Sequence, residues 1–388
     1  MKILLATGIF PPEIGGPATY TKLVAREFTV RGHDVVIVTY GDGENPKSEI
    51  RNPKQIQNSN IQVIFVSRGV PKGVRHFIYF WKVLTNGRSA DVIYAQDPVS
   101  AGLPALWAAR LLRKKFLVRV AGDYAWEQSI QRFGITDLLD DFVKKTYSAR
   151  IERLRHVEQK VARAAHRVIV PSEYLKRIVM AWGVPEDHIT VIYSVVESYV
   201  LPDRKTSRAA LGFAENEIIL LSIGRLVPWK GFEVLIRIFP EVKKQFQVGL
   251  VIIGDGPMRE KLAILAKQDG VVMTGAEPTE RVQKYLASSD VFLLNTAYEG
   301  FSHQILEALA AGAPVITTLA GGNAEIVRDG ENALVAQYND EVAWTKALLR
   351  ICGDHALRER LKIGGYASVR EYSVERMINK LQNVLENT

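Results

Sequence analysis

The feature of this sequence that most constrains its fold is a regular alternation of short apolar runs with longer amphipathic stretches. The runs are continuously apolar, as expected of strands buried on both faces, and the stretches between them have helical spacing. Strands that alternate with helices form parallel sheets through crossover connections. In the first half we therefore predict a helix at about 17–31 and strands at 2–7, 35–40, 61–66, 92–95, 116–120, 167–170 and 189–193.

The same pattern begins again after a polar, proline-containing stretch at 199–207, which is typical of a linker. A chain of 388 residues is longer than one hydrophobic core usually supports. We therefore predict two doubly wound α/β domains, at 1–200 and 201–372. The second-half strands are expected at 218–223, 249–253, 271–274, 291–294 and 314–317.

Composition excludes several classes of protein. A single cysteine, Cys352, leaves no internal disulfide framework and no multi-cysteine metal site, and it fits a cytoplasmic location. No run of about 18 uncharged apolar residues is present, so no membrane-spanning helix is expected. Two prolines interrupt the short apolar N-terminus, which favours a buried first strand over a secretory signal.

The net charge of +8 is unevenly distributed. Residues 1–200 hold 28 Lys and Arg against 19 Asp and Glu, whereas residues 201–388 hold 22 against 23. The excess favours an acidic partner for the first half, such as anionic lipid or a phosphorylated acceptor, or else a solvated basic face. Nucleic acid is disfavoured, because no known binding module is visible.

Two loops of the second half carry residue types that suit a diphosphate. Arg225 and Lys230 follow the predicted strand 218–223; an arginine fork binds phosphate oxygens, and a lysine adds a mobile charge. Gly254 follows the next strand, where glycine lets the backbone approach a ligand closely. The same glycine equally suits a tight turn between a strand and a helix.

A third loop of the second half holds two carboxylates. The predicted strand 291–294 runs into Glu299, and a helix begins near Ser302. Amides at a helix start bind anions, and carboxylates accept hydrogen bonds from sugar hydroxyls. Glu307 lies inside that helix, on a different element from Glu299, so the two need not form an acid–base pair. The alternative for Glu307 is a helix-surface residue with a salt-bridge partner.

Taken together, the order and spacing of these segments resemble the retaining glycosyltransferases of family 4, which have the GT-B architecture. The similarity includes Gly224-Arg225-Leu226, the Glu299–Glu307 segment and Gly321-Gly322-Asn323, and it continues in the first half at 10–16, 31–35 and 170–173. The resemblance implies two Rossmann-like domains that face each other across a cleft. It also implies that a C-terminal helix, at about 373–388, packs back on the first domain.

The resemblance implies roles at the matching positions. Arg225 and Lys230 would hold the donor diphosphate, Glu307 the ribose hydroxyls and Glu299 the transferred sugar. Backbone groups of two loops would approach phosphate or sugar, at Gly300, Phe301, Ser302, Gly15 and Gly16. For the paired glycines, the alternative is an ordinary loop. No metal or other cofactor is expected, because two cations and a helix start supply the positive charge.

One departure from the family pattern concerns the end of the predicted strand 116–120. Many members carry a histidine there, near the transferred sugar, whereas this chain has Ala121-Gly122-Asp123. Asp123 is the nearest candidate for a hydrogen bond to sugar or acceptor, and capping of the next turn is the alternative. His303 and His33 have no metal-ligand neighbours in the sequence.

Residues 72–82 interleave cations and aromatics, and a second basic helix is expected within 144–167. These segments suit an anionic membrane surface, although Phe77, Phe80 and Trp81 at helical spacing more often belong to a core. The leading hypothesis is a retaining transferase that moves a hexose from a nucleoside-diphosphate sugar to an acceptor hydroxyl. A lipid-linked or cell-envelope glycan acceptor would place it peripherally on the inner face of the plasma membrane. A nucleotide-sugar epimerase or hydrolase, and a non-catalytic nucleotide-binding module, are the alternatives.

Overall fold

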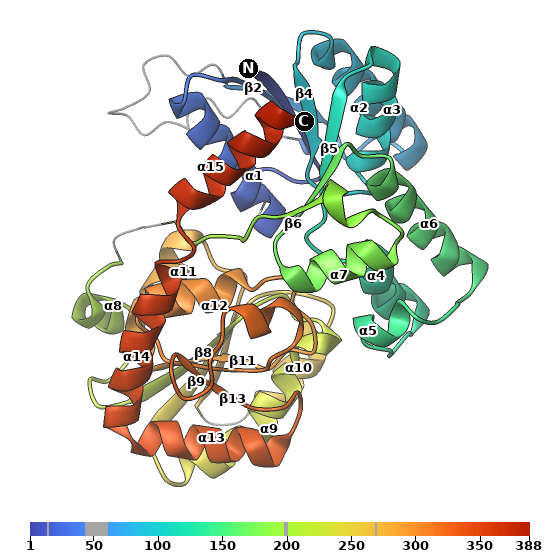
Figure 1. Ribbon diagram of the computed structural model, residues 1–388. Helices are drawn as coiled ribbons and strands as arrows, with labels where there is room; N and C mark the ends of the chain where they lie inside the picture. Colours follow the sequence, from blue (N-terminus) through green and yellow to red (C-terminus); the bar gives the residue numbers. More distant parts are fainter. Residues whose placement is uncertain (14, 43–60, 198–200, 268–269) are drawn as a thin grey trace. The chain divides into compact units, whose positions relative to one another are not determined.

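The computed structural model describes residues 1–13, 15–42, 61–197, 201–267 and 270–388 (Figure 1). Contacts within the chain divide it into two compact units. The first unit comprises Met1–Tyr193 together with Glu375–Thr388, and the second comprises Ser194–Val374. Each unit contains one parallel β-sheet.

The sheet of the first unit has the strand order β3-β2-β1-β4-β5-β6-β7, and all its pairings are parallel. Its central strands are buried along their length, as the continuous apolar runs predict. The order reverses direction between β1 and β4, which makes this the switch point of the sheet. The strands are β1 (Lys2–Thr7), β2 (Asp34–Tyr40), β3 (Ile61–Val66), β4 (Val92–Ala95), β5 (Lys115–Arg119), β6 (Arg167–Val170) and β7 (Ile189–Val191).

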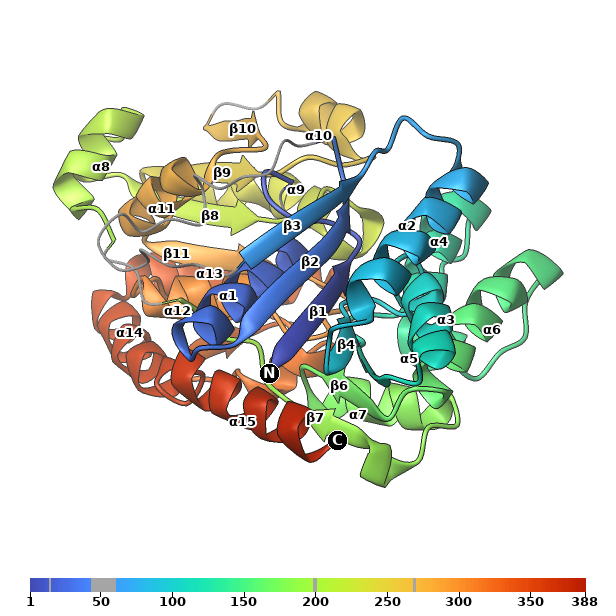
Figure 2. The same ribbon diagram turned by 90° about the horizontal axis from the view of Figure 1, so that it is seen from above.

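Helices cover both faces of this sheet, with α1 on one face and α2 and α3 on the other (Figure 2). The C-terminal helix α15 lies beside α1, and Arg31 after α1 donates a hydrogen bond of 2.7 Å to Gln382. The helices are α1 (Gly16–Val30), α2 (Lys72–Gly87), α3 (Gly102–Leu112), α4 (Tyr124–Phe133), α5 (Leu139–Phe142), α6 (Ala149–Arg163), α7 (Glu173–Ala181) and α15 (Val374–Asn387).

The sheet of the second unit is also wholly parallel, in the order β10-β9-β8-β11-β12-β13. Its switch point lies between β8 and β11, where Leu220 is in register with Val291. The strands are β8 (Ile218–Ile223), β9 (Val248–Ile253), β10 (Val271–Gly275), β11 (Val291–Leu294), β12 (Val315–Thr317) and β13 (Ala333–Val335).

The helices of the second unit pack on this sheet and on one another, α9 against α13 and α12 against α14. Trp344 of α13 is fully buried in the core that α9 and α13 form with the sheet. The helices are α8 (Arg204–Leu211), α9 (Phe232–Lys243), α10 (Arg259–Leu265), α11 (Thr279–Ser288), α12 (His303–Ala310), α13 (Glu341–Gly353) and α14 (His355–Val369), with short 3₁₀ turns at Pro228–Lys230 and Gly321–Glu325.

The predicted fold class, two doubly wound parallel α/β domains, is confirmed. The predicted strands differ from the observed ones by at most two residues at either end, but the short strand β13 was not predicted. The linker expected at 199–207 is wrong in its second part, since α8 begins at Arg204 and Asp203 caps it by accepting a hydrogen bond from the Thr206 amide. Residues 198–200 lie outside the described ones.

The core interpretation of Phe77, Phe80 and Trp81 is wrong for two of them, since Phe77 is 63% exposed and Trp81 is 52% exposed, while Phe80 is partly buried. The residue of this segment that is fully buried is Tyr79. The Tyr79 hydroxyl donates to the carbonyl oxygens of Thr7 and Val38, which fixes this face of α2 on the sheet. No helix within the described parts of the chain is long and apolar enough to span a membrane.

Candidate donor site of the second unit

Most of the predicted site residues of the second unit lie on two loops at its switch point. The loop after β8 carries Arg225 and Lys230, and the loop after β11 carries Glu299 and leads into α12. Because β8 and β11 are neighbouring parallel strands, both loops leave the sheet at the same edge. In open α/β sheets this edge, at the switch point, is where ligands bind.

The two loops are tied together by backbone and buried side-chain hydrogen bonds. The amide of Ala297 donates to the carbonyl oxygen of Trp229 at 2.8 Å. Asn295 is fully buried, and its side-chain amide donates to the carbonyl of Gly231 at 3.0 Å. Gly231 has φ +52°, and a Cβ there would lie 2.4 Å from Asn295 Nδ2. The loops therefore form one rigid support rather than two independent segments.

Lys230 and Glu299, one from each loop, form a buried ion pair. The Lys230 ammonium contacts Glu299 Oε1, and the two side chains are only 10% and 12% exposed. Burial of this kind strengthens the attraction but also leaves either charge costly without its partner. The pair therefore fixes the position of a cation at the switch point, where an anionic ligand would benefit from it.

The start of α12 is built by a capping serine. The Ser302 side chain accepts a hydrogen bond of 3.3 Å from the Ile305 amide, and Ser302 is 1% exposed. The ring of Phe301 packs edge-on against Tyr372, with ring centroids 5.4 Å apart. Neither side chain is thus directed to a ligand, and what these residues present is a helix N-terminus with its positive dipole end.

A third loop supports this helix start. The Gly322 amide donates to the Glu299 carbonyl at 2.9 Å, and a Cβ on Gly322 would lie 2.2 Å from the Gly300 carbonyl oxygen. Thr318, after β12, donates from its hydroxyl to the carbonyl of Thr296 at 2.6 Å. The motif glycines at this position therefore bring the two backbones into contact.

Glu307 lies on the second turn of α12 and is partly buried. Among the residues that the structure describes, no hydrogen bond or ion pair reaches its carboxylate, so the salt-bridge alternative has no support. Burial raises the pKa of Glu307 to about 7. A desolvated carboxylate without a protein partner is suited to accept hydrogen bonds from ligand hydroxyls.

Arg225 and Gly254 differ in what they offer at this edge. Arg225 is exposed on the loop directly after β8. Gly254 has φ +147°, and a Cβ on it would lie 1.9 Å from the Gly224 carbonyl oxygen. Close packing of the loops after β8 and β9 thus accounts for this glycine by itself, which favours the tight-turn interpretation.

Three predicted site residues belong to the first unit. Gly15 is the N-cap of α1 and Gly16 is its first residue, and the helix start has no side-chain cap and no acidic residue in its first turn. A Cβ on Gly15 would lie 2.8 Å from Ile9 Cδ1, whereas one on Gly16 would meet nothing within 4 Å. The loop thus requires the first glycine for packing. Residue 14 lies outside the described part of the chain.

Asp123, the third, is the N-cap of α4 and is 1% exposed. Its carboxylate accepts a 2.7 Å hydrogen bond from the Trp126 amide and a hydrogen bond from the carboxyl group of Glu158 on α6. Burial raises the pKa of Asp123 to about 6, and burial together with the Asp123 charge holds the pKa of Glu158 well above its usual range. The geometry favours the capping interpretation over direct contact with substrate.

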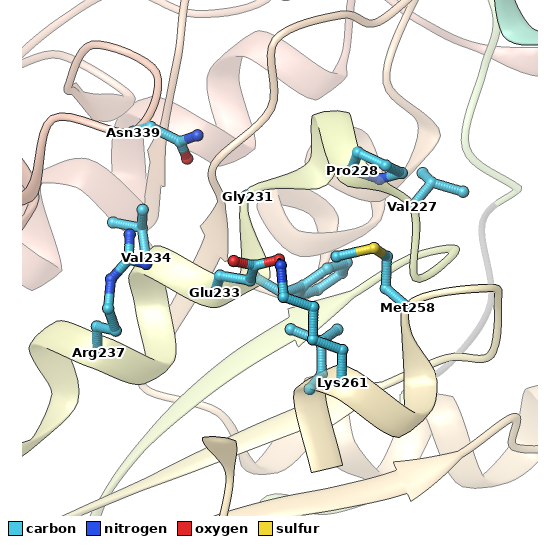
Figure 3. A pocket seen from close by; sticks show the side chains of 11 residues that line it. Val227, Pro228, Gly231, Glu233, Val234, Arg237, Met258, Lys261 and Asn339 are labelled. Atoms are coloured by element: carbon cyan, nitrogen blue, oxygen red, sulfur yellow. The ribbon is translucent and has the colours of Figure 1, made fainter. Parts of the chain in front are cut away.

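A separate cavity of about 280 Å³ lies between α9, α10 and the turn Pro228–Lys230 (Figure 3). Lys261 and Glu233 point toward one another across it and form an ion pair of 2.7 Å. None of the predicted donor-site residues lines this cavity. In the described regions, no group of three or more His, Cys, Asp or Glu side chains is arranged to hold a metal ion.

Sequence reasoning missed the buried residues that hold the loops of the site in place. Asn295 and Thr296 are buried polar residues directly after a strand, which is a usable signal for a loop-bracing role. Glu158 was missed because its helix appears basic and solvated. Its spacing of seven residues from the buried Ile151 places it on the buried face and would have revealed it.

Two family models describe this chain. The model for glycosyl transferases group 1 matches residues 203–368, and the model for glycosyltransferase family 4 matches residues 14–198. The matched ranges correspond to the two units, and together they cover nearly the whole chain.

Individual relatives agree with the family models. An uncharacterized glycosyltransferase of Methanocaldococcus jannaschii, MJ1607, is 28% identical over 99% of this chain and 97% of the relative. The alpha-monoglucosyldiacylglycerol synthase of Streptococcus pneumoniae is 25% identical over 81% of this chain and 70% of its own. The fold matches Anabaena HepE in complex with UDP-glucose, with a TM-score of 0.78, 19% identity and full coverage of both chains. The chain is therefore a glycosyltransferase of family 4, with the GT-B fold.

Proposed function

We propose that this glycosyltransferase transfers a hexosyl group from a nucleoside-diphosphate sugar to an acceptor hydroxyl with retention of configuration. Lys230, Arg225 and the start of α12 bind the diphosphate and stabilise its charge as the bond to the anomeric carbon breaks. Glu307 accepts hydrogen bonds from the ribose hydroxyls. Glu299 holds Lys230 in place and faces the sugar.

The observation that carries this proposal is the presence at one sheet edge of a fixed cation, Lys230, and of a desolvated carboxylate, Glu307, that has no partner among the described residues. A nucleoside diphosphate presents both matching groups, phosphate oxygens for Lys230 and ribose hydroxyls for Glu307. Arg225, Lys230 and a helix dipole lie at one sheet edge and can offset part of the diphosphate charge, although Glu299 balances one of the two cations. No metal ion is required in this scheme.

Solved relatives provide a donor class. The Anabaena HepE structures contain UDP and UDP-glucose, and a uridine donor is therefore the first to test. The pneumococcal relative is named as a synthase of a glucosylated diacylglycerol. By analogy, we propose a lipid-linked or cell-envelope glycan acceptor and a peripheral location on the inner face of the plasma membrane.

Thermal-shift screening against UDP-, GDP- and ADP-sugars tests the donor site. We expect one nucleotide class to raise the melting temperature of the wild-type chain. Glu307→Ala should need at least tenfold more donor for the same rise, because hydrogen bonds to a charged group are lost. Glu280→Ala, an exposed glutamate on α11, is the matched control and should bind like the wild type.

The stereochemical part is tested by the anomeric configuration of the glycoside formed, read by NMR coupling constants. An α-linked donor should give an α-linked product. An inverted product would contradict retention, and absence of stabilisation by any of the nucleotide sugars would contradict the donor site itself. Donor turnover without any acceptor would instead favour a hydrolase or an epimerase.

A further inference from the structure

A cavity of about 220 Å³ lies at the amino edge of the second sheet, away from the donor loops. Residues just before β11 and β12, among them Asp290 and Pro314, form one wall. Arg204 at the start of α8 and the segment 355–362 of α14 form the others, and we name this space the α8–α14 cavity. In a parallel sheet, segments that precede strands lie at the edge opposite to the loops that follow them. None of the described donor-site residues lines the α8–α14 cavity.

Positive charge is in excess on the wall that contains Asp290. The Asp290 carboxylate lies 2.6 Å from the Arg204 guanidinium and 3.2 Å from that of Arg208, and it also accepts a hydrogen bond of 2.8 Å from the Ile219 amide. One carboxylate thus serves two guanidinium groups. A net positive charge therefore remains on this side of the cavity.

The helix α14 adds three basic side chains from one of its faces. His355, Arg358 and Lys362 are three and four residues apart, and this spacing aligns them along the helix. Among the described lining residues, α14 offers one carboxylate, that of Glu359. It lies 3.5 Å from the Lys362 ammonium, and both side chains are substantially exposed, so this ion pair is weak. His355 is the first residue of the helix, where backbone amides add partial positive charge.

Arg358 is held in a position from which it can bind an anion. Its Nη1 donates to the carbonyl oxygens of Ile351 and Cys352, near the end of α13, at 2.6 and 2.8 Å. No carboxylate in the described parts of the chain forms an ion pair with Arg358, and its Nε and Nη2 have no hydrogen bond there. The carboxylate of Asp354, which caps α14, accepts from the Leu357 amide instead. The guanidinium therefore keeps two parallel donors for ligand oxygens.

The lining also indicates which class of anion fits. Apart from the imidazole of His355, no described residue that lines the cavity carries an aromatic ring, so a nucleobase has no surface on which to stack. The volume is below the roughly 300 Å³ at which pockets for larger organic ligands begin. An arginine fork beside a lysine ammonium is suited to phosphate oxygens. These features favour a single phosphate group over a nucleotide.

We propose that the α8–α14 cavity binds a small phosphate-class oxyanion, which is either inorganic phosphate or the phosphate group of a monoester. Arg358 binds two of its oxygens, Lys362 and His355 contact the others, and Arg204 faces it from α8. The bound anion offsets the excess positive charge and joins α8 to α14, and it thereby stabilises the folded second unit. This site goes beyond the proposed function, because it lies at the other edge of the sheet and requires no donor.

Histidine NMR tests where the anion binds. The full-length chain carrying Lys230→Ala, which lacks the donor-site cation, is titrated with inorganic phosphate to roughly 20 mM at constant pH and ionic strength. We expect the imidazole signals of His355, assigned with His355→Ala, to shift and to saturate. The signals of His156, an exposed residue of α6, should not move. Glycerol 3-phosphate is the second probe: half-saturation at a lower concentration than with phosphate identifies a monoester ligand, and half-saturation at a higher concentration identifies the free ion.

Calorimetry with inorganic phosphate measures the binding of variants. Lys362→Glu should weaken binding about tenfold or more, because a charged contact is replaced by repulsion. Arg358→Gln should weaken it to a similar degree, but this variant also removes hydrogen bonds at the end of α13. Lys362→Glu is therefore the decisive variant, since its side chain is 37% exposed. Lys346→Glu, at an exposed position of α13 outside the cavity, makes the same change in net charge and should bind like the wild type.

Several results would overturn the proposal. His355 signals that do not respond to phosphate, or binding that Lys362→Glu leaves unchanged, would exclude this cavity. Equal weakening by Lys346→Glu would reduce the effect to net charge. Binding to the wild type that Lys230→Ala abolishes would place the phosphate in the donor site.

Donor turnover separates this proposal from the proposed function. Without phosphate, Lys362→Glu should consume donor at the wild-type rate, because the α8–α14 cavity takes no part in the transfer. Loss of phosphate binding with normal donor turnover contradicts the cavity proposal alone. A normal response of His355 to phosphate in a wild-type chain that binds no nucleotide sugar contradicts the proposed function alone.

Discussion

A buried pair of ionisable side chains follows a strand in each unit of this glycosyltransferase, and these two pairs have opposite characters. In the second unit, Lys230 and Glu299 carry opposite charges and bridge two loops at the switch point. In the first unit, Asp123 and Glu158 are both acids, and they remain together only because Glu158 keeps its proton. The first pair positions an ammonium group at a ligand edge, whereas the second neutralises charge inside the fold.

The difference shows how burial alone misleads as a guide to function. Both pairs involve perturbed or costly ionisable groups, and such groups cluster at functional sites. The hydrogen-bond partners of each group show which of the two pairs can bind a ligand. The Asp123 carboxylate is occupied by the Trp126 amide and Glu158, whereas Lys230 retains two further ammonium hydrogens that an anion can use.

The largest expected effect comes from removing the cation of the second unit. Lys230→Ala should lower kcat/KM for donor consumption a hundredfold or more, because an electrostatic contact to the departing diphosphate is lost. Lys261→Ala breaks a different ion pair of the same unit, with Glu233, and should retain activity. Steady-state kinetics with coupled detection of the released nucleotide measures both. Wild-type rates in Lys230→Ala would exclude this lysine from the reaction.

The next effect concerns the stability of the first unit. Asp123→Ala should lower the free energy of unfolding by roughly 2–3 kcal/mol, since it removes a helix cap and leaves buried donors without a partner. Asp123→Asn should lower the free energy of unfolding by less. Asp340→Ala removes a partly exposed cap of α13 and should lower it by about 1 kcal/mol. Urea titration gives these values. Activity per folded molecule should remain, and its loss would instead place Asp123 at the substrate.

The proton shared by the acid pair predicts a pH dependence. Folding raises the pKa of both groups, so their contribution to stability is complete below about pH 4 and is lost as the pH rises through about 6. Glu158→Gln keeps a hydrogen-bond donor without the second acid. The free energy of unfolding of this variant, relative to that of the wild type, should therefore rise by on the order of 2 kcal/mol between pH 4 and pH 8. If urea titrations show the same change in the free energy of unfolding between the two pH values for the wild type and the variant, that result would contradict a shared proton.

The smallest effect tests whether Glu307 completes the ligand edge. With a pKa of about 7, its carboxylate is mostly protonated at pH 6 and ionised at pH 8. Donor binding through ribose hydroxyls should therefore tighten up to about tenfold over this range in wild type, and Glu307→Gln should show a flat profile. Calorimetry with a nucleotide sugar is suitable, since its diphosphate does not titrate there. A flat wild-type profile would remove the carboxylate from donor recognition.

Much of the fold could be predicted, because continuous apolar runs report burial on both faces and recur with helices between them. The strands 61–66 and 291–294 match the observed bounds at both ends. Phe77 and Trp81 could not be assigned, since helical periodicity shows which side chains share a face but not whether that face meets the sheet or solvent. Tyr79 and Val83 occupy the inner face instead.

The site was harder to predict than the fold, because its pairings join residues far apart in the chain. Lys230 and Glu299 are 69 residues apart, and Asp123 and Glu158 are 35 apart, so neither pair has a local signature. Residue types at strand ends indicated where a ligand would bind. Only the fold could show that Gly254 is explained by packing on Gly224 and that Asp123 already has its partners.

The membership of α15 in the first unit has a consequence for how the protein is made. Met377, Ile378 and Leu381 of this helix are buried, and Gln382 accepts a hydrogen bond from Arg31. The ribosome therefore releases the final part of the first unit only after the entire second unit has been synthesised. Domains usually fold as they emerge, N-terminal first. Here the first domain must wait, with part of its hydrophobic surface uncovered, until α15 has been synthesised.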